Sequence, residues 1–90
     1  MPSLPNLQRE SNRRIFYEMN SEEIINRCRK QIGDQVKIAR ENKNISLRDL
    51  AEQTGIAFQH ISRVEQGKHN VTIDTLALIS HQLGIEIKIE

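Results

Sequence analysis

The side chains best suited to chemistry in this sequence lie in one short stretch, IAFQHISRVEQGK, at residues 56–68. If this stretch is a helix, one outward stripe carries Phe58, Gln59, Ser62 and Arg63. Glutamine can bond adenine and arginine can bond guanine through paired hydrogen bonds, while an aromatic ring can contact a thymine methyl group. Solvated faces of short helices carry the same polar residues, so the stripe by itself favours a solvated face.

No arrangement of catalytic or metal-binding residues competes with this stripe. Cys28 is the single cysteine and cannot form a disulfide within the chain, and His60, His69 and His81 lack the spacing of a metal site. No serine, histidine and acid can be argued to converge, and nothing in the sequence would activate the thiol. The sequence therefore predicts no enzyme, no cofactor and no metal.

The composition indicates a small helical domain. The chain has 90 residues, of which 37% are hydrophobic and 3% aromatic, enough for a helical core but lean for a β-sandwich. Its formal net charge is +1, so a surface for nucleic acid would need local segregation of charge. The sequence shows neither a signal peptide nor about 18 consecutive apolar residues, and we expect a cytoplasmic protein that does not contact membranes.

The two ends of the chain differ from its middle. Residues 1–19 contain both prolines and are expected to form a polar tail, partly ordered at 13–18. Solvation suits this tail better than a role as an arm that follows DNA. Residues 85–90, IEIKIE, alternate isoleucine with charge as a half-buried β-strand does. This strand needs a partner, either the same strand of a second chain or the RRIFYEM segment at 13–19 of either chain.

Residues 20–84 carry the signals of successive helices. The first begins at Asn20, which with Glu23 resembles a capping box, and it continues to the NKN stretch as one helix or as two with Gly33 as the weak point. Three shorter helices follow, each bounded by capping or helix-ending residues: Ser46 to Gly55, Ile56 to Gly67, and Thr72 to Gly84. The last helix is expected to face the core with Ile73, Leu76, Ile79, Ser80 and Leu83.

The pair of helices joined at Gly55 matches a helix-turn-helix. Ala51 is small enough for two helix axes to approach, and Gly55 can adopt the left-handed conformation of a sharp turn. Over about residues 32–84 the sequence resembles the Cro and phage-repressor type (XRE-like) helix-turn-helix family of transcriptional regulators. The residues that carry the resemblance are Arg40, Ser46, Leu50, Ala51, Gly55, Ile61, Glu65, Gly67, Leu76, Ile79 and Leu83. The fold implied is all-α, a compact bundle of about five helices of the lambda-repressor-like type, plus the short C-terminal β-strand.

The resemblance also implies a DNA-binding role for residues 20–84. The helix at 56–66 would enter the major groove of double-stranded DNA, and base contacts would come from the stripe named above, Phe58, Gln59, Ser62 and Arg63. Phosphate contacts are expected from Ser46, Leu47, Arg48, Gln66, Lys68 and Asn70. Leu47 stands where the family often has glutamine, so its backbone N–H would have to make that contact.

Two further roles follow from the resemblance and from the size of an operator. Arg40 and Glu65 match positions that form a buried, structural ion pair in related repressors. One helix touches few base pairs, so we expect a homodimer with half-sites about 34 Å apart. The expected dimer surface, with residues 85–90 as a dimerisation element, includes Leu78, Leu83, Ile85, Ile87 and Ile89.

These observations leave three hypotheses for function. The first is a sequence-specific transcriptional regulator, most simply a repressor that binds a palindromic operator. The second is an antitoxin that represses its own operon and binds a toxin, because the terminal strand resembles that of some antitoxins. The third is a protein-interaction module, favoured by the near-neutral charge and by Phe58, whereas Arg63 and Lys68 favour DNA.

Overall fold

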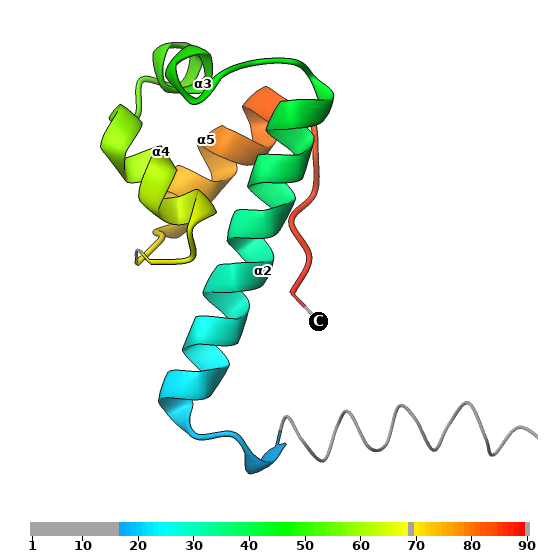
Figure 1. The fold of residues 1–90 in the computed structure, drawn as a ribbon, viewed down its shortest axis with the longest axis vertical. Helices are drawn as coiled ribbons and strands as arrows, with labels where there is room; N and C mark the ends of the chain where they lie inside the picture. Colours follow the sequence, from blue (N-terminus) through cyan, green and yellow to red (C-terminus); the bar gives the residue numbers. More distant parts are fainter. Residues whose placement is uncertain (1–16, 69, 90) are drawn as a thin grey trace, which may run out of the picture.

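The computed structural model describes residues 17–68 and 70–89, and this part of the chain is built from four α-helices without a β-strand. The helices are α2 (Ser21–Asn42), α3 (Leu47–Thr54), α4 (Phe58–Glu65) and α5 (Ile73–Leu83). Helix α2 is the longest, and α3, α4 and α5 gather around its C-terminal half, while its first turns project beyond them (Figure 1). The predicted all-helical class is confirmed for the described residues. The tail expected at residues 1–19 lies outside them, except for 17–19.

The expected bundle of about five helices is wrong for the described residues, because α2 is uninterrupted. Its N-cap, Asn20, accepts a hydrogen bond from the backbone N–H of Glu23 at 2.9 Å. Gly33 is buried in its middle, and a Cβ atom built there would lie 2.5 Å from the carbonyl oxygen of Val64. Gly33 is therefore the position at which the backbones of α2 and α4 come together, rather than a break in the helix.

The hairpin of α3 and α4 follows the predicted helix signals closely. Ser46 and Asp49 form a reciprocal capping box at the start of α3, with hydrogen bonds of 3.0 and 3.1 Å. Gly55 ends α3 with φ at 74°, a left-handed conformation that glycine adopts without strain. Helix α4 begins at Phe58, two residues later than expected, because Ile56 and Ala57 form the turn.

All four helices contribute to one apolar core. Its buried members are Ile32, Val36, Leu50, Ile61, Val64, Ile79 and Leu83. Helix α5 begins after the N-cap Thr72 and ends at Gly84, as predicted. The assignment of Ile73 to the core face is wrong, since its side chain is 82% exposed. It lies about 100° around the helix from the buried pair Ile79 and Leu83.

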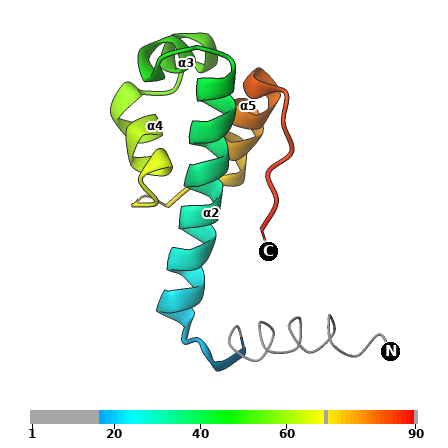
Figure 2. The same ribbon diagram turned by 45° about the vertical axis from the view of Figure 1, so that its right-hand side comes forward.

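The C-terminal segment, residues 85–89, is extended but forms no strand, so that prediction is wrong. Figures 1 and 2 both show it running back beside α2. The Gln35 side chain accepts a hydrogen bond from the backbone N–H of Lys88 at 2.8 Å and donates one to the Lys88 carbonyl oxygen. Ile85 and Ile87 pack partly buried against the core. A single amide on α2 thus supplies the pairing expected from a neighbouring strand.

Candidate nucleic-acid interface

Helix α4 turns one side to the core and presents the other on the surface. Ile61 and Val64 are buried, at 0% and 1% exposure. The outer side forms a shallow groove, here called the α4 face, lined by Phe58, Gln59, Ser62, Arg63, Gln66 and Lys68. The structure therefore brings together all four residues expected to read bases and two of those expected to bind phosphate. The helical period predicted the outward stripe, and the resemblance implied the roles of its residues and of Gln66 and Lys68.

An ion pair fixes the C-terminal end of α4 to α2. The Arg40 guanidinium donates to both carboxylate oxygens of Glu65, at 2.7 and 3.1 Å, and to the carbonyl oxygen of Ile45 at 2.9 Å. The two side chains are 12% and 6% exposed. Hydrogen bonding to Glu65 raises the pKa of Arg40 above its ordinary value, despite the opposing effect of burial. The pair therefore sets the position of α4 and lies away from the α4 face.

Phe58 lies outside the core, at the first position of α4. Its side chain is 44% exposed, and the Arg48 guanidinium lies over its ring at 5.9 Å from the centroid. This distance is within the range of a cation–π interaction. The contact joins the start of α3 to the start of α4, and it was not predicted from the sequence, where Arg48 is expected to contact phosphate. No periodicity in the sequence could have shown it, because it depends on the angle between two helices.

The other residues expected to contact phosphate lie at two places. Ser46, Leu47 and Arg48 occupy the start of α3, where Leu47 packs partly buried against the core. The Ser46 backbone N–H donates to the Asp49 carboxylate, and this hydrogen bond, followed by one from the Ser46 side chain, lowers the pKa of that carboxyl. The Ser46 hydroxyl also accepts a hydrogen bond from the Asp49 backbone N–H. After α4, the Gln66 amide donates to the Ser62 hydroxyl at 3.0 Å. Nearby, Asn70 accepts a hydrogen bond from the guanidinium of Arg29 on α2.

The residues expected at a dimer surface do not form one exposed patch. Leu83 is 1% exposed and belongs to the core, so its assignment to a dimer surface is wrong. Ile85 and Ile87 are half-buried against the same chain, whereas Leu78 and Ile89 are 52% and 55% exposed. A second chain could therefore reach only part of the expected set.

Residues 17–68 and 70–89 show neither a metal-binding cluster nor a membrane-spanning helix. This part of the chain contains no group of three or more histidine, cysteine, aspartate or glutamate side chains placed to hold a metal ion. None of its helices combines the length and apolar character needed to cross a membrane.

Comparisons with known proteins place this geometry in a family. A family model described as Helix-turn-helix matches residues 36–89. Two uncharacterised HTH-type transcriptional regulators of Mycobacterium tuberculosis, from strains CDC 1551 / Oshkosh and ATCC 25618 / H37Rv, are each 31% identical to the chain over 57 residues. That alignment takes in 63% of this chain but 41% of each relative, so the chain spans less than half the length of the curated relatives it matches. No solved structure matches the chain.

The matched region includes α3, the turn at Gly55, α4 and the ion pair between Arg40 and Glu65. It also covers more than half of the chain. These residues are the ones on which the resemblance seen in the sequence depends. The chain therefore belongs to the XRE-like helix-turn-helix family.

Proposed function

We propose that this protein is a DNA-binding transcriptional regulator that reads base sequence with the α4 face. The observation that carries the proposal is the grouping of Phe58, Gln59, Ser62 and Arg63 on one open surface of a helix-turn-helix domain. Both relatives are named as HTH-type transcriptional regulators, which supports the same role. In such domains the second helix of the motif docks in the major groove.

Each residue of the stripe has a chemical role in this proposal. Gln59 and Arg63 are exposed and have the donor geometry for adenine and guanine, respectively. Phe58 presents an apolar edge suited to a thymine methyl group, and Arg48 holds the ring from one side. Ser62 donates or accepts a single hydrogen bond.

Phosphate contacts would flank the stripe and orient the helix. We assign them to the start of α3 and to the turn after α4, namely Ser46, the backbone N–H of Leu47, Arg48, Gln66, Lys68 and Asn70. Because the net charge of the chain is only +1, this local arrangement has to provide the attraction to DNA.

A repressor that binds a palindromic operator as a homodimer is the simplest form of this function. A single α4 would read only a few base pairs, whereas two related by a twofold axis would read two half-sites about 34 Å apart. Residues 20–84 would form the DNA-binding domain, and residues 85–90 would lie outside it. We propose no toxin partner, because the terminal strand that suggested an antitoxin is absent from the described residues.

The exposed aromatic ring supports a second candidate function. Phe58 is 44% exposed on the α4 face, and an exposed aromatic residue is typical of protein-interaction surfaces. The alternative is therefore a protein-interaction module that keeps the helix-turn-helix fold but binds no specific DNA.

Selection of the protein on a random duplex pool, at two salt concentrations, tests the proposal. We expect an enriched inverted repeat. Arg63→Ala should weaken binding by about 1–3 kcal/mol and relax the preference at one position of each half-site. Lys88→Ala removes the same charge from the C-terminal segment, across α2 from α4, and should bind as the parent does. Weak binding that fades with salt and enriches no sequence would favour the protein-interaction module.

A further inference from the structure

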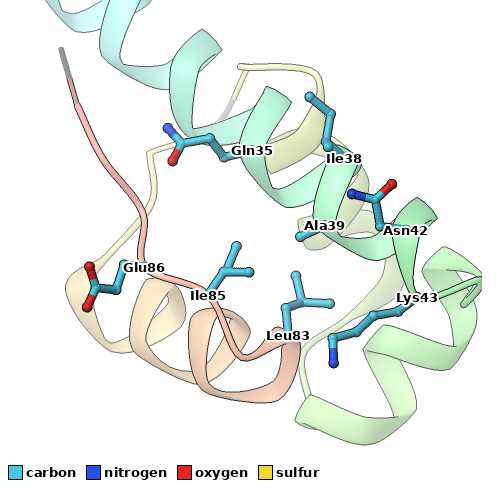
Figure 3. A pocket seen from close by; sticks show the side chains of 8 residues that line it. All are labelled: Gln35, Ile38, Ala39, Asn42, Lys43, Leu83, Ile85 and Glu86. Carbon is cyan, nitrogen blue, oxygen red and sulfur yellow. The ribbon is translucent and has the colours of Figure 1, made fainter.

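A second groove, here called the α2 groove, lies on the opposite face of α2 from α4. Gly33 and Arg40 face α4, whereas the groove residues of α2 are centred about 190° around the helix from Gly33. The lining residues are Gln35, Ile38, Ala39, Asn42, Lys43, Leu83, Ile85 and Glu86. Figure 3 shows them arranged around a space bounded by α2, the end of α5 and the start of the C-terminal segment.

The middle of the α2 groove is apolar and open to solvent. Ala39 and Ile85, both half-buried, lie in its centre, the buried Leu83 lies beneath them, and Ile38 at its edge is 57% exposed. An exposed isoleucine beside an apolar depression gives a protruding group and a receptor for such a group on one surface. A surface with both can bind a copy of itself about a twofold axis.

The charges at the groove point to the same occupant. Figure 3 places Lys43 and Glu86 at opposite ends of the apolar centre. Both residues are exposed, and neither side chain forms a salt bridge within the part of the chain that the structure describes. A twofold axis lying across the groove, midway between the two residues, brings each lysine against the glutamate of the other copy. The surface is therefore complementary to itself in charge as well as in shape.

We propose that two copies of this chain associate through the α2 groove, with Ile38 of each copy against the apolar centre of the other copy's groove and two Lys43–Glu86 pairs at the ends. The inference rests on the proposed function, since it gives the homodimer its surface. Helix α4 lies across α2 from the groove, so the dimer leaves both α4 faces uncovered and on its outer sides. Two separated reading helices are what an operator with two half-sites requires.

The first test measures self-association of the full chain without DNA, by analytical ultracentrifugation over a concentration series. We expect a dimer whose dissociation constant rises at least about tenfold in Ile38→Ala, because an apolar side chain at the centre of an interface carries much of its affinity. Ile25→Ala is the matched control, since Ile25 lies on the same helix and is 46% exposed. A monomer throughout the series, or equal dimers in both variants, would overturn the proposal.

The second test exchanges the charges. Lys43→Glu and Glu86→Lys each place like charges at both ends of the groove, and each should raise the dissociation constant about tenfold or more. Mixing the two variants should restore association, because a mixed dimer again has opposite charges at both ends. Retention of one variant by an affinity-tagged copy of the other reports this mixed dimer. Restored association would exclude misfolding as the cause, because mixing cannot rescue lost helical structure. Failure of the mixture to associate would overturn the proposal.

These measurements separate the dimer from DNA recognition, because they contain no DNA. If the protein forms a dimer that Ile38→Ala weakens but selects no operator, the proposed dimer surface stands and the proposed reading of DNA fails. If the protein selects an operator but mixing Lys43→Glu with Glu86→Lys does not restore association, the proposed reading of DNA stands and the proposed dimer surface fails.

Discussion

The two sides of α2 hold their neighbours in different ways. On the side of α4, Gly33 allows backbone contact and Arg40 makes a nearly buried ion pair with Glu65. On the other side, Gln35 holds the C-terminal segment through hydrogen bonds to Lys88 in an exposed place. The helix proposed to read DNA therefore has a position set by groups that cannot be replaced easily. The opposite side is held by one amide and by the half-buried Ile85 and Ile87, and it keeps apolar surface available.

The largest effect should come from breaking the ion pair. Arg40→Ala would leave the Glu65 carboxylate, 6% exposed, without its partner, and we expect a loss of about 3–5 kcal/mol in the free energy of unfolding. Urea unfolding followed by circular dichroism measures this loss. Arg63→Ala is the control, since Arg63 is exposed on α4 and should change stability by less than about 0.5 kcal/mol. Equal losses in the two variants would show that the pair does not hold α4.

Adding one methyl group at Gly33 should produce the next largest effect. Helix propensity alone predicts that Gly33→Ala stabilises α2 by about 1 kcal/mol. The structure predicts the opposite sign, because the new Cβ atom would lie 2.5 Å from the backbone oxygen of Val64 and 2.7 Å from that of Glu65. We expect a net loss of about 1–3 kcal/mol in the free energy of unfolding. Asn26→Ala, at an exposed position of the same helix, should be neutral or slightly stabilising.

The sequence could predict the features that depend on neighbouring residues, but not those that depend on the packing of distant helices. The helix ends at Ser46, Gly55, Thr72 and Gly84 follow from local hydrogen bonds and backbone conformations, so neighbouring residues were enough to place them. The outward stripe of α4 followed from the helical period in the same way. The role of Gly33 depends on another helix, and only the packing of α2 against α4 reveals it.

The C-terminal segment could not be predicted because its partner is far away in the sequence. Alternating isoleucines fit a strand and equally fit an extended segment with one side against a helix. Gln35 and Lys88 are 53 positions apart, and no local pattern links an amide on a helix to that backbone. The contact between Arg48 and Phe58 was missed for a similar reason, since it depends on the angle between α3 and α4.

A smaller effect is expected on the other side of α2. Gln35→Ala removes both hydrogen bonds to Lys88, and because they are exposed we expect a loss of about 1 kcal/mol or less in the free energy of unfolding. Amide hydrogen exchange at Lys88 should quicken, while exchange in α4 should stay as it is. Gln59→Ala is the control, as an exposed glutamine on α4. Unchanged exchange at Lys88 would show that Ile85 and Ile87 hold the segment without the amide.

The smallest effect concerns the capping box of α3. Hydrogen bonds from Ser46 lower the pKa of Asp49 in the folded state, so the carboxylate stabilises the fold above its unfolded pKa of about 3.9. That contribution is lost as the pH falls through the lower, folded value. We therefore expect Asp49→Asn to be less stable than the parent near neutral pH and the difference to shrink in acid. Glu52→Gln, an exposed neighbour on α3, serves as the control; a difference that persists in strong acid would assign the effect to packing.

The contact at Gly33 also constrains how this sequence can diverge. A side chain at this position would have to push the end of α4 away from α2, and the α4 face would tilt with it. A mutation there therefore acts at a distance on recognition, by changing the angle at which the protein would meet DNA. Under the proposed function, lineages that keep the same DNA target should retain this glycine, whereas a lineage that loses it should also change its DNA target.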